Sequence, residues 1–139
     1  MKNFSVTVSI RSTPERIWAL LTDAAEYTRW NNTVEQVDGQ IAPGQRVTIR
    51  PKANPGSAFP VKVTAFESPQ RMVWTGGMPL GLFRGERTFM LIPDLNGGTE
   101  FSKREEYSGL MAPLICRSIP NLQPAFDEFA GDLKRAAEM

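Results

Sequence analysis

Apolar and polar residues alternate from Phe4 to Ile10, which predicts a β-strand with one face on a hydrophobic core. The spacing changes directly afterwards, because Ile17 and Leu21 lie one helical turn apart on a segment that begins at Pro14. A second short helical segment, residues 24–30, ends before a pair of asparagines. The pattern therefore predicts one strand followed by two short helices.

The start of the first helix has a clear signal. Ser12 or Thr13 can cap it, and the sequence leaves the choice between them open. Pro14 suits the first helical position, and Glu15 complements the positive end of the helix dipole.

The middle of the chain shows period-two alternation broken by turn residues, which is typical of an antiparallel meander. A loop is expected from Pro51 to Ser57, and the stretch from Pro93 to Gly98 predicts a hairpin turn. The expected strands carry Val34 and Val37, Val47 and Ile49, Val61 to Ala65, and Met72 to Trp74, followed by two longer strands over about Phe83–Ile92 and Thr99–Tyr107.

Pro120 and Pro124 divide the C-terminal segment, because proline removes a backbone donor from a helix interior. We expect a short helical piece before Pro120 and the main helix from about Asn121, with Phe126, Phe129 and Leu133 on one apolar stripe. The predicted fold class is α+β, with a curved antiparallel sheet of about seven strands around a long C-terminal helix. A length of 139 residues fits a single domain over residues 1–139.

The segment Ser12–Asp23, followed by Tyr27 and Trp30, resembles the opening of the START-like superfamily. That superfamily includes polyketide cyclase/dehydrase and lipid-transport proteins, pollen-allergen-like proteins and chaperone-activator relatives. Residues 97–101 and 104–109 look like its penultimate hairpin. The resemblance implies a helix-grip fold with an internal apolar cavity between the sheet and the long helix.

Charge and composition narrow the partners. The chain has 16 Lys and Arg against 15 Asp and Glu, a net charge of +1, so we expect no nucleic-acid partner. It has no apolar run of about 18 residues, so no stable membrane insertion is expected. The first residues lack the apolar core of a signal peptide, and the single cysteine, Cys116, has no internal partner. A cytoplasmic protein fits these features best.

The chain contains no histidine, which removes the usual general base and the usual metal ligand. We therefore predict no metal or cofactor and identify no catalytic residue. In the START-like superfamily the second strand of the last hairpin often carries a histidine, and Lys103 takes that position here. This departure favours a protein that holds a molecule over one that transforms it.

The last two strands bring charged and aromatic residues onto one face. The odd-numbered residues of both strands share a face, so Arg87, Lys103 and Glu105 lie among phenylalanines. One register places Arg87 opposite Glu105. The other places Phe89 opposite Phe101 and Glu86 opposite Arg104, and the sequence does not decide between them.

The aromatic residues either fill a packed core or surround a cavity. The segment from Gly76 to Phe83, with three glycines and four large apolar residues, is a candidate for a flexible loop at the cavity mouth. The candidate ligand-binding residues are Trp30, Trp74, Met78, Phe83, Arg87, Phe89, Phe101, Lys103, Glu105, Tyr107, Phe126 and Phe129.

Three functions fit this pattern. The first is binding of a small hydrophobic, lipid- or polyketide-like molecule in the internal cavity. The second is an enzyme of the cyclase/dehydratase type that uses Tyr or Glu as acid and base in the same cavity. The third is a protein-interaction module similar to the chaperone activators, with its cavity filled by side chains.

Overall fold

A computed structural model describes residues 3–52 and 54–139 of the chain. Met1 and Lys2, at the N-terminus, and Ala53, within the loop expected over residues 51–57, lie outside the described residues.

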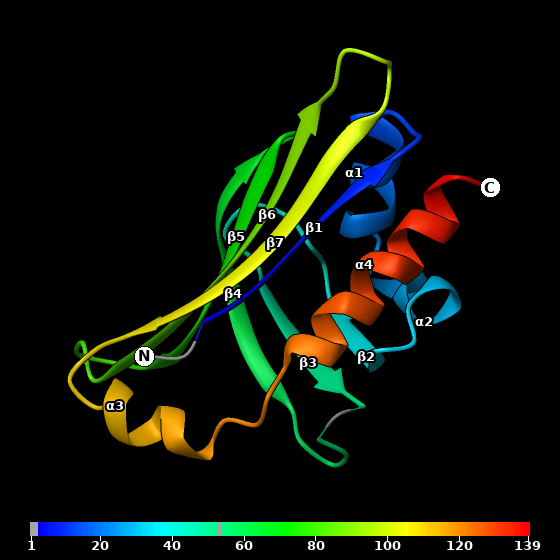
Figure 1. Ribbon diagram of the computed structural model, residues 1–139. Helices are drawn as coiled ribbons and strands as arrows, with labels where there is room; N and C mark the ends of the chain where they lie inside the picture. Colours follow the sequence, from blue (N-terminus) through cyan, green and yellow to red (C-terminus); the bar gives the residue numbers. More distant parts are fainter. Residues whose placement is uncertain (1–2, 53) are drawn as a thin grey trace.

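One antiparallel sheet of seven strands forms the body of the molecule (Figure 1). Its strand order is β1-β7-β6-β5-β4-β3-β2, so each strand from β2 to β6 pairs with the next one along the chain, and β1 pairs with β7. The strands are β1 (Asn3–Ile10), β2 (Val34–Gly39), β3 (Arg46–Pro51), β4 (Phe59–Glu67), β5 (Arg71–Met78), β6 (Phe83–Pro93) and β7 (Thr99–Ser108).

The helices lie on one side of the curved sheet (Figure 1). They are α1 (Pro14–Thr22), the 3₁₀ turn η1 (Ala24–Glu26), α2 (Tyr27–Trp30), α3 (Ala112–Ile115), the 3₁₀ turn η2 (Cys116–Ser118) and the long α4 (Gln123–Ala137). This arrangement confirms the predicted α+β helix-grip fold. No helix in residues 3–52 and 54–139 is long and apolar enough to cross a lipid bilayer.

The cap of α1 is Thr13, which settles the choice that the sequence left open. Its backbone is extended, and its Oγ1 accepts a hydrogen bond from the backbone N–H of Arg16 at 3.2 Å. The long helix α4 begins at Gln123, two residues later than expected, because the Asn121 side chain accepts a hydrogen bond from the Gln123 N–H at that point.

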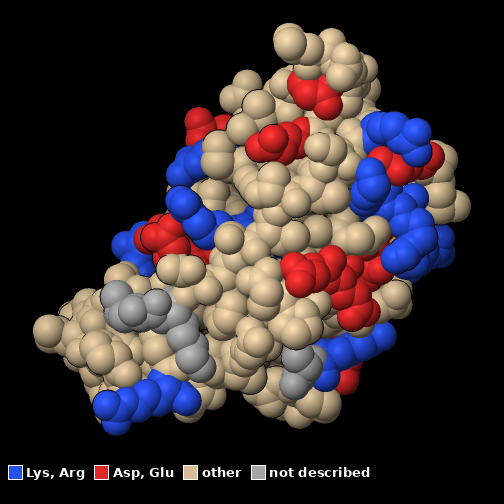
Figure 2. All heavy atoms as spheres, in the orientation of Figure 1, with Lys and Arg blue, Asp and Glu red and all other residues tan. Residues whose placement is uncertain are grey.

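Figure 2 shows one face of the molecule, where Lys and Arg side chains lie interspersed with Asp and Glu side chains. This face presents no broad field of one sign, in keeping with the near balance of charges in the sequence.

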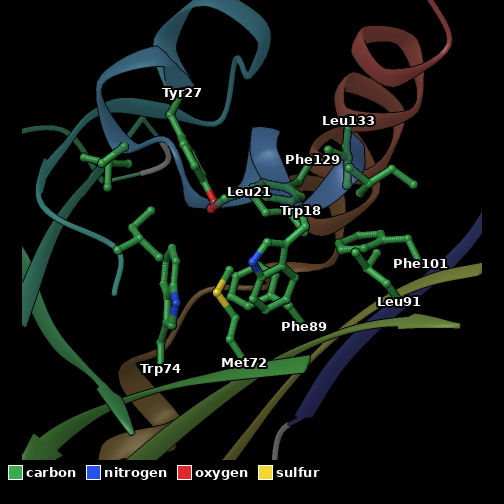
Figure 3. Packing of buried hydrophobic residues seen from close by; sticks show 14 of the residues in the cluster. Trp18, Leu21, Tyr27, Met72, Trp74, Phe89, Leu91, Phe101, Phe129 and Leu133 are labelled. Carbon is green, nitrogen blue, oxygen red and sulfur yellow. The ribbon is translucent and has the colours of Figure 1, made fainter. Parts of the chain in front are cut away.

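The apolar stripe of α4 packs against the sheet and the two short helices. Phe129 lies at the centre of this contact, with its ring centroid 6.2 Å from Phe101, 6.2 Å from Phe89 and 6.3 Å from Tyr27. Burial of one such ring contributes about 1.5–3 kcal/mol to folding. Figure 3 shows the surrounding cluster, which includes Trp18, Leu21, Met72, Trp74, Leu91 and Leu133.

The stretch from Gly76 to Phe83 is not the open loop that we expected. β5 continues through the glycines to Met78, and the backbone of Gly77 pairs with Arg84 while Met78 pairs with Phe83. Gly77 has φ of +128°, and a Cβ at this position would collide with the Phe83 carbonyl oxygen. Half of the stretch is therefore paired strand, and residues 79–82 form the hairpin turn.

Candidate functional site

A cavity of about 450 Å³ lies between the sheet and the segment that leads into α4. The sheet contributes residues from β3 to β7, and the opposite wall comes from α3, η2 and the residues before α4. The larger cavity is thus covered by residues 115–122. We expected it between the sheet and the long helix, so this expectation was wrong for the larger cavity. Its lining residues are Ile49, Pro51, Asn54, Phe59, Pro60, Val61, Trp74, Gly76, Gly77, Phe83, Gly85, Arg87, Glu105, Tyr107, Ile115, Ser118, Ile119, Pro120 and Leu122.

Glycines on β5 and β6 help to leave this space open. Gly76, Gly77 and Gly85 all line the cavity and contribute no side chain to it. Gly85 pairs with Gly76 on one side and with Tyr107 on the other. A Cβ at Gly85 would meet the Tyr107 ring at 3.5 Å, an ordinary contact distance. Glycines on the inner face of neighbouring strands are thus a signal for the cavity that the aromatic residues alone did not provide.

A smaller chamber of about 70 Å³ lies directly under α4. It shares five lining residues with the larger cavity, so the two spaces are neighbours: Ile49, Pro51, Trp74, Arg87 and Leu122. Its own wall contains Tyr27 and Lys103, together with the rings of Phe89, Phe126 and Phe129.

An ion pair joins β6 and β7 at the boundary of the cavity. Strand pairing places Arg87 opposite Glu105, so the first of the two expected registers is correct and the second is wrong. The Arg87 guanidinium lies 3.1 Å from Glu105 Oε1, and Tyr107 donates a hydrogen bond to Glu105 Oε2 at 2.8 Å. Glu86 faces Glu106, and Arg104 pairs with Glu106 on the other side of the sheet.

The contacts among Arg87, Glu105 and Tyr107 determine the charge that each side chain carries. Burial alone would raise the pKa of Glu105, but the Arg87 charge and the hydrogen bonds from Tyr107 and Arg87 outweigh burial, so the pKa lies below its usual value. Burial, together with the neighbouring Glu105 carboxylate, raises the pKa of Tyr107. At neutral pH the group therefore holds a carboxylate, a guanidinium and a neutral phenol.

Two N–H donors at the cavity wall have no hydrogen-bond partner among the described residues. They are Trp74 Nε1 and Arg87 Nε, and both atoms are buried. Trp74 is 2% exposed, and both residues line the larger cavity as well as the small chamber. Buried polar groups in proteins are nearly always satisfied, so two unpaired donors on residues that line both spaces are unusual.

Lys103 lies in the small chamber and is 4% exposed. Its Nζ is 3.7 Å from the ring centroid of Phe129 and 4.4 Å from that of Phe126. Burial and the nearby Arg87 charge lower the pKa of Lys103 well below its usual value, although Glu105 acts in the opposite direction.

The structure brings most of the candidate residues to these two spaces. Phe101 instead packs in the core and the half-buried Trp30 packs against it; both contact Phe129, and neither lines a cavity. Met78 is 48% exposed at the end of the β5–β6 hairpin and also lies outside both linings. The candidates that do line a cavity are Trp74, Phe83, Arg87, Phe89, Lys103, Glu105, Tyr107, Phe126 and Phe129.

The wall formed by residues 115–122 was not predicted from the sequence. Ile115, Ile119 and Leu122 line the larger cavity from a segment that is interrupted by Pro120. Their apolar spacing is visible in the sequence, but proline breaks the helical pattern that would have marked it as an inward face. In the described part of the chain, Cys, Asp and Glu side chains form no group of three that could hold a metal ion.

Comparison with known proteins agrees with this architecture. A model of the family described as polyketide cyclase/dehydrase and lipid transport matches residues 1–138. The chain belongs to this family. No curated protein matches the sequence. The description of the polyketide cyclase/dehydrase and lipid transport family covers both enzymes and carriers, so membership alone leaves the activity open.

Solved structures with similar folds span most of the chain. Protein MLL2253 from Mesorhizobium loti is 23% identical over 96% of this chain and 95% of its own, with a TM-score of 0.74. The Aha1 dimer from Colwellia psychrerythraea is 19% identical over 100% and 98%, with a TM-score of 0.73. A norcoclaurine synthase point mutant from Thalictrum flavum, in complex with a transition state analogue, is 12% identical over 98% and 93%, with a TM-score of 0.71. At these identities the likeness shows the fold alone.

Proposed function

We propose that this member of the polyketide cyclase/dehydrase and lipid transport family binds a small, largely apolar molecule in the cavity between the sheet and residues 115–122. The observation that carries the proposal is the cavity itself, about 450 Å³ in volume and bordered by two unpartnered buried donors. Small-molecule sites in proteins commonly have volumes of about 300–1,000 Å³ and combine apolar walls with a few polar groups.

The polar groups at the wall specify the chemistry of the ligand. Trp74 Nε1 and Arg87 Nε both donate, so the ligand should carry a hydrogen-bond acceptor such as a carbonyl, ether or hydroxyl oxygen. Arg87 is already neutralised by Glu105, so the ligand needs no full negative charge to balance it. A flat aromatic or acyl molecule with one oxygen at its end fits this arrangement.

An enzyme of the cyclase/dehydratase type is less well supported by the polar group. A general base works best with a pKa near the working pH. The environment instead lowers the pKa of Glu105 and raises that of Tyr107, which makes the first a weak base and the second a weak acid. The pair is suited to orienting a ligand more than to transferring its protons.

A protein-interaction module with a filled cavity is also less well supported. That hypothesis requires side chains to occupy the space under residues 115–122. Glycine at positions 76, 77 and 85 contributes no side chain there, and the space is open in the described structure.

A ligand titration tests the proposal. The probes are 1-naphthol, flavanone and decanoic acid, and the readouts are tryptophan fluorescence and the shift in melting temperature. We expect at least one probe to bind with 1:1 stoichiometry, and we expect binding to weaken at least tenfold in Arg87→Leu and Glu105→Gln.

Arg84→Leu is the matched control, because Arg84 forms an exposed ion pair with Glu86 on the same strand and lines neither cavity. This variant should bind as the wild type does. Absence of binding for every probe, or equal binding in all four proteins, would contradict the proposed site.

A further inference from the structure

Lys103 lies in surroundings that are unusual for a lysine. It projects from the middle of β7 into the chamber under α4, where its Nζ lies within 6 Å of the ring centroids of Phe89, Phe126 and Phe129. Lysine is almost never fully buried unless it is paired. Within residues 3–52 and 54–139, no carboxylate forms an ion pair with Lys103 and no atom accepts a hydrogen bond from it.

The charges around Lys103 favour the uncharged amine. The ionisable groups nearest to it are Arg87 on β6, Glu105 on β7 and Tyr27 on α2. Arg87 repels an ammonium group, and the Glu105 carboxylate that would attract one is already engaged by Arg87 and Tyr107. The Tyr27 hydroxyl donates a hydrogen bond to the Leu21 carbonyl oxygen at 2.6 Å, and burial raises the pKa of Tyr27. Tyr27 therefore stays neutral and supplies no negative charge.

We propose that Lys103 is a covalent attachment site for carbonyl compounds, namely aldehydes and ketones whose apolar body occupies the larger cavity. The inference rests on the proposed function, because the carbonyl compound must first enter that cavity. A neutral lysine amine is the nucleophile of Schiff-base chemistry, and burial is the usual means by which proteins keep it neutral.

The step balances without any further reactant. The lone pair of Nζ attacks the carbonyl carbon, the carbon–oxygen double bond becomes a single bond, and a proton moves from nitrogen to oxygen to give a carbinolamine. Loss of one water molecule then forms the C=N bond. Nothing is oxidised or reduced, and hydrolysis returns the amine and the carbonyl compound.

The sizes of the two spaces suit this reaction, because each can hold a different part of the ligand. The chamber beside Lys103, about 70 Å³, holds a carbonyl group but no ring system, whereas the neighbouring cavity of about 450 Å³ holds the body of the ligand. Arg87 lines both spaces, so it lies at the boundary that such a ligand would cross.

Reductive trapping tests the proposal. Protein is incubated at pH 7 with 2-naphthaldehyde and sodium cyanoborohydride, which reduces an imine to a stable amine. Intact mass spectrometry then counts the adducts, and peptide mapping locates them. We expect the adduct on Lys103 to be at least tenfold more abundant than on any exposed lysine, because exposed lysines are protonated at this pH. The α-amino group is partly neutral at pH 7, and the peptide map separates any adduct there from the adduct on Lys103.

Two variants and a second ligand sharpen the result. Lys103→Met should lose the adduct, while Lys62→Met, which removes an exposed lysine from β4, should keep it. The peptide map of the wild-type protein gives the answer even if Lys103→Met folds poorly. 2-Naphthalenemethanol has the same ring system and cannot form an imine, so its binding reports the cavity alone.

The outcomes separate the two proposals. Binding of the alcohol without an adduct on Lys103, or with adducts spread over the surface lysines, overturns the covalent site and leaves the binding function intact. Failure of both compounds to bind contradicts the covalent site and the proposed function together.

Discussion

Lys103 is the residue where stability and function oppose each other most clearly. Its ammonium form must give up hydration among phenylalanine rings, and it gains no ion pair in the described structure in return. The unfolded chain binds a proton at this residue up to about its ordinary pKa of 10.5, whereas the folded protein releases it at lower pH. The buried amine therefore destabilises the folded state at neutral pH, which is understandable if the amine serves a ligand.

Replacement of Lys103 by methionine should stabilise the protein at pH 7 by about 1–4 kcal/mol, because an apolar side chain of similar length fills the same chamber. At Lys103 the folded wild-type protein binds fewer protons than the unfolded chain does. Its free energy of unfolding therefore rises with pH, until the pH reaches the ordinary lysine pKa of about 10.5. The advantage of the variant should shrink over that range by up to about 1.4 kcal/mol per pH unit.

Urea unfolding at several pH values between 6 and 10 measures this difference. Lys62→Met, at an exposed position of β4, is the control and should stay within about 0.5 kcal/mol of the wild type. A Lys103→Met variant that is less stable than the wild type at pH 7 would show that the amine is well accommodated.

At the scale of elements, alternation and capping signals were sufficient to predict most strands and helices. The odd-numbered face of β6 and β7 turns inward as expected, because a strand can turn only one face to the core. Phe89, Leu91 and Phe101 on this face are buried, and the residues that line the larger cavity are half-buried. The register between β6 and β7 could not be predicted from the sequence, since the turn over residues 93–98 is compatible with two pairings. The structure fixes it: Asp94 Oδ1 accepts hydrogen bonds from the N–H groups of Asn96 and Gly98.

The cap of α1 gives a direct test of a choice that the sequence left open. Thr13→Ala should lower the free energy of unfolding by about 1 kcal/mol, because it removes the acceptor for the Arg16 N–H. Ser12→Ala should change it little, since the contact made by Ser12 to Thr99 uses its backbone carbonyl. Thermal unfolding of both variants compares the two positions, and equal losses would contradict the assignment of the cap.

Two glycines with open space around them should respond in opposite directions. Gly131 lies on an exposed position of α4, and Gly131→Ala should stabilise the protein by about 0.5–1 kcal/mol through helix propensity. Gly44 has φ of +75°, so Gly44→Ala should destabilise it by about 1 kcal/mol. Denaturant titration measures both, and a loss of stability in Gly131→Ala would contradict the described course of α4.

At the scale of the whole molecule, the sequence was sufficient to predict the fold. It was sufficient to predict only part of the cavity's position. Arg87, Glu105 and Tyr107 were found because strand alternation places them on one face. The wall at residues 115–122 was not found, because the side on which an irregular segment folds is decided by contacts distant in sequence. Met111 illustrates this: its N–H bonds to the Leu82 carbonyl at 2.8 Å and so ties the segment to the β5–β6 turn.

If the space beside Gly85 holds a ligand, then filling that space with a side chain should abolish binding. Gly85 has ordinary strand geometry, and a Cβ there would meet the Tyr107 ring at 3.5 Å, so Gly85→Leu should fold with its side chain in the cavity. Native mass spectrometry of both proteins with each of the three probes (1-naphthol, flavanone and decanoic acid), and of each protein as freshly purified, measures occupancy. We predict a 1:1 complex for the wild type and at least a tenfold lower occupancy for Gly85→Leu. Equal occupancy in the two proteins, or no complex in either, would contradict ligand binding in this cavity.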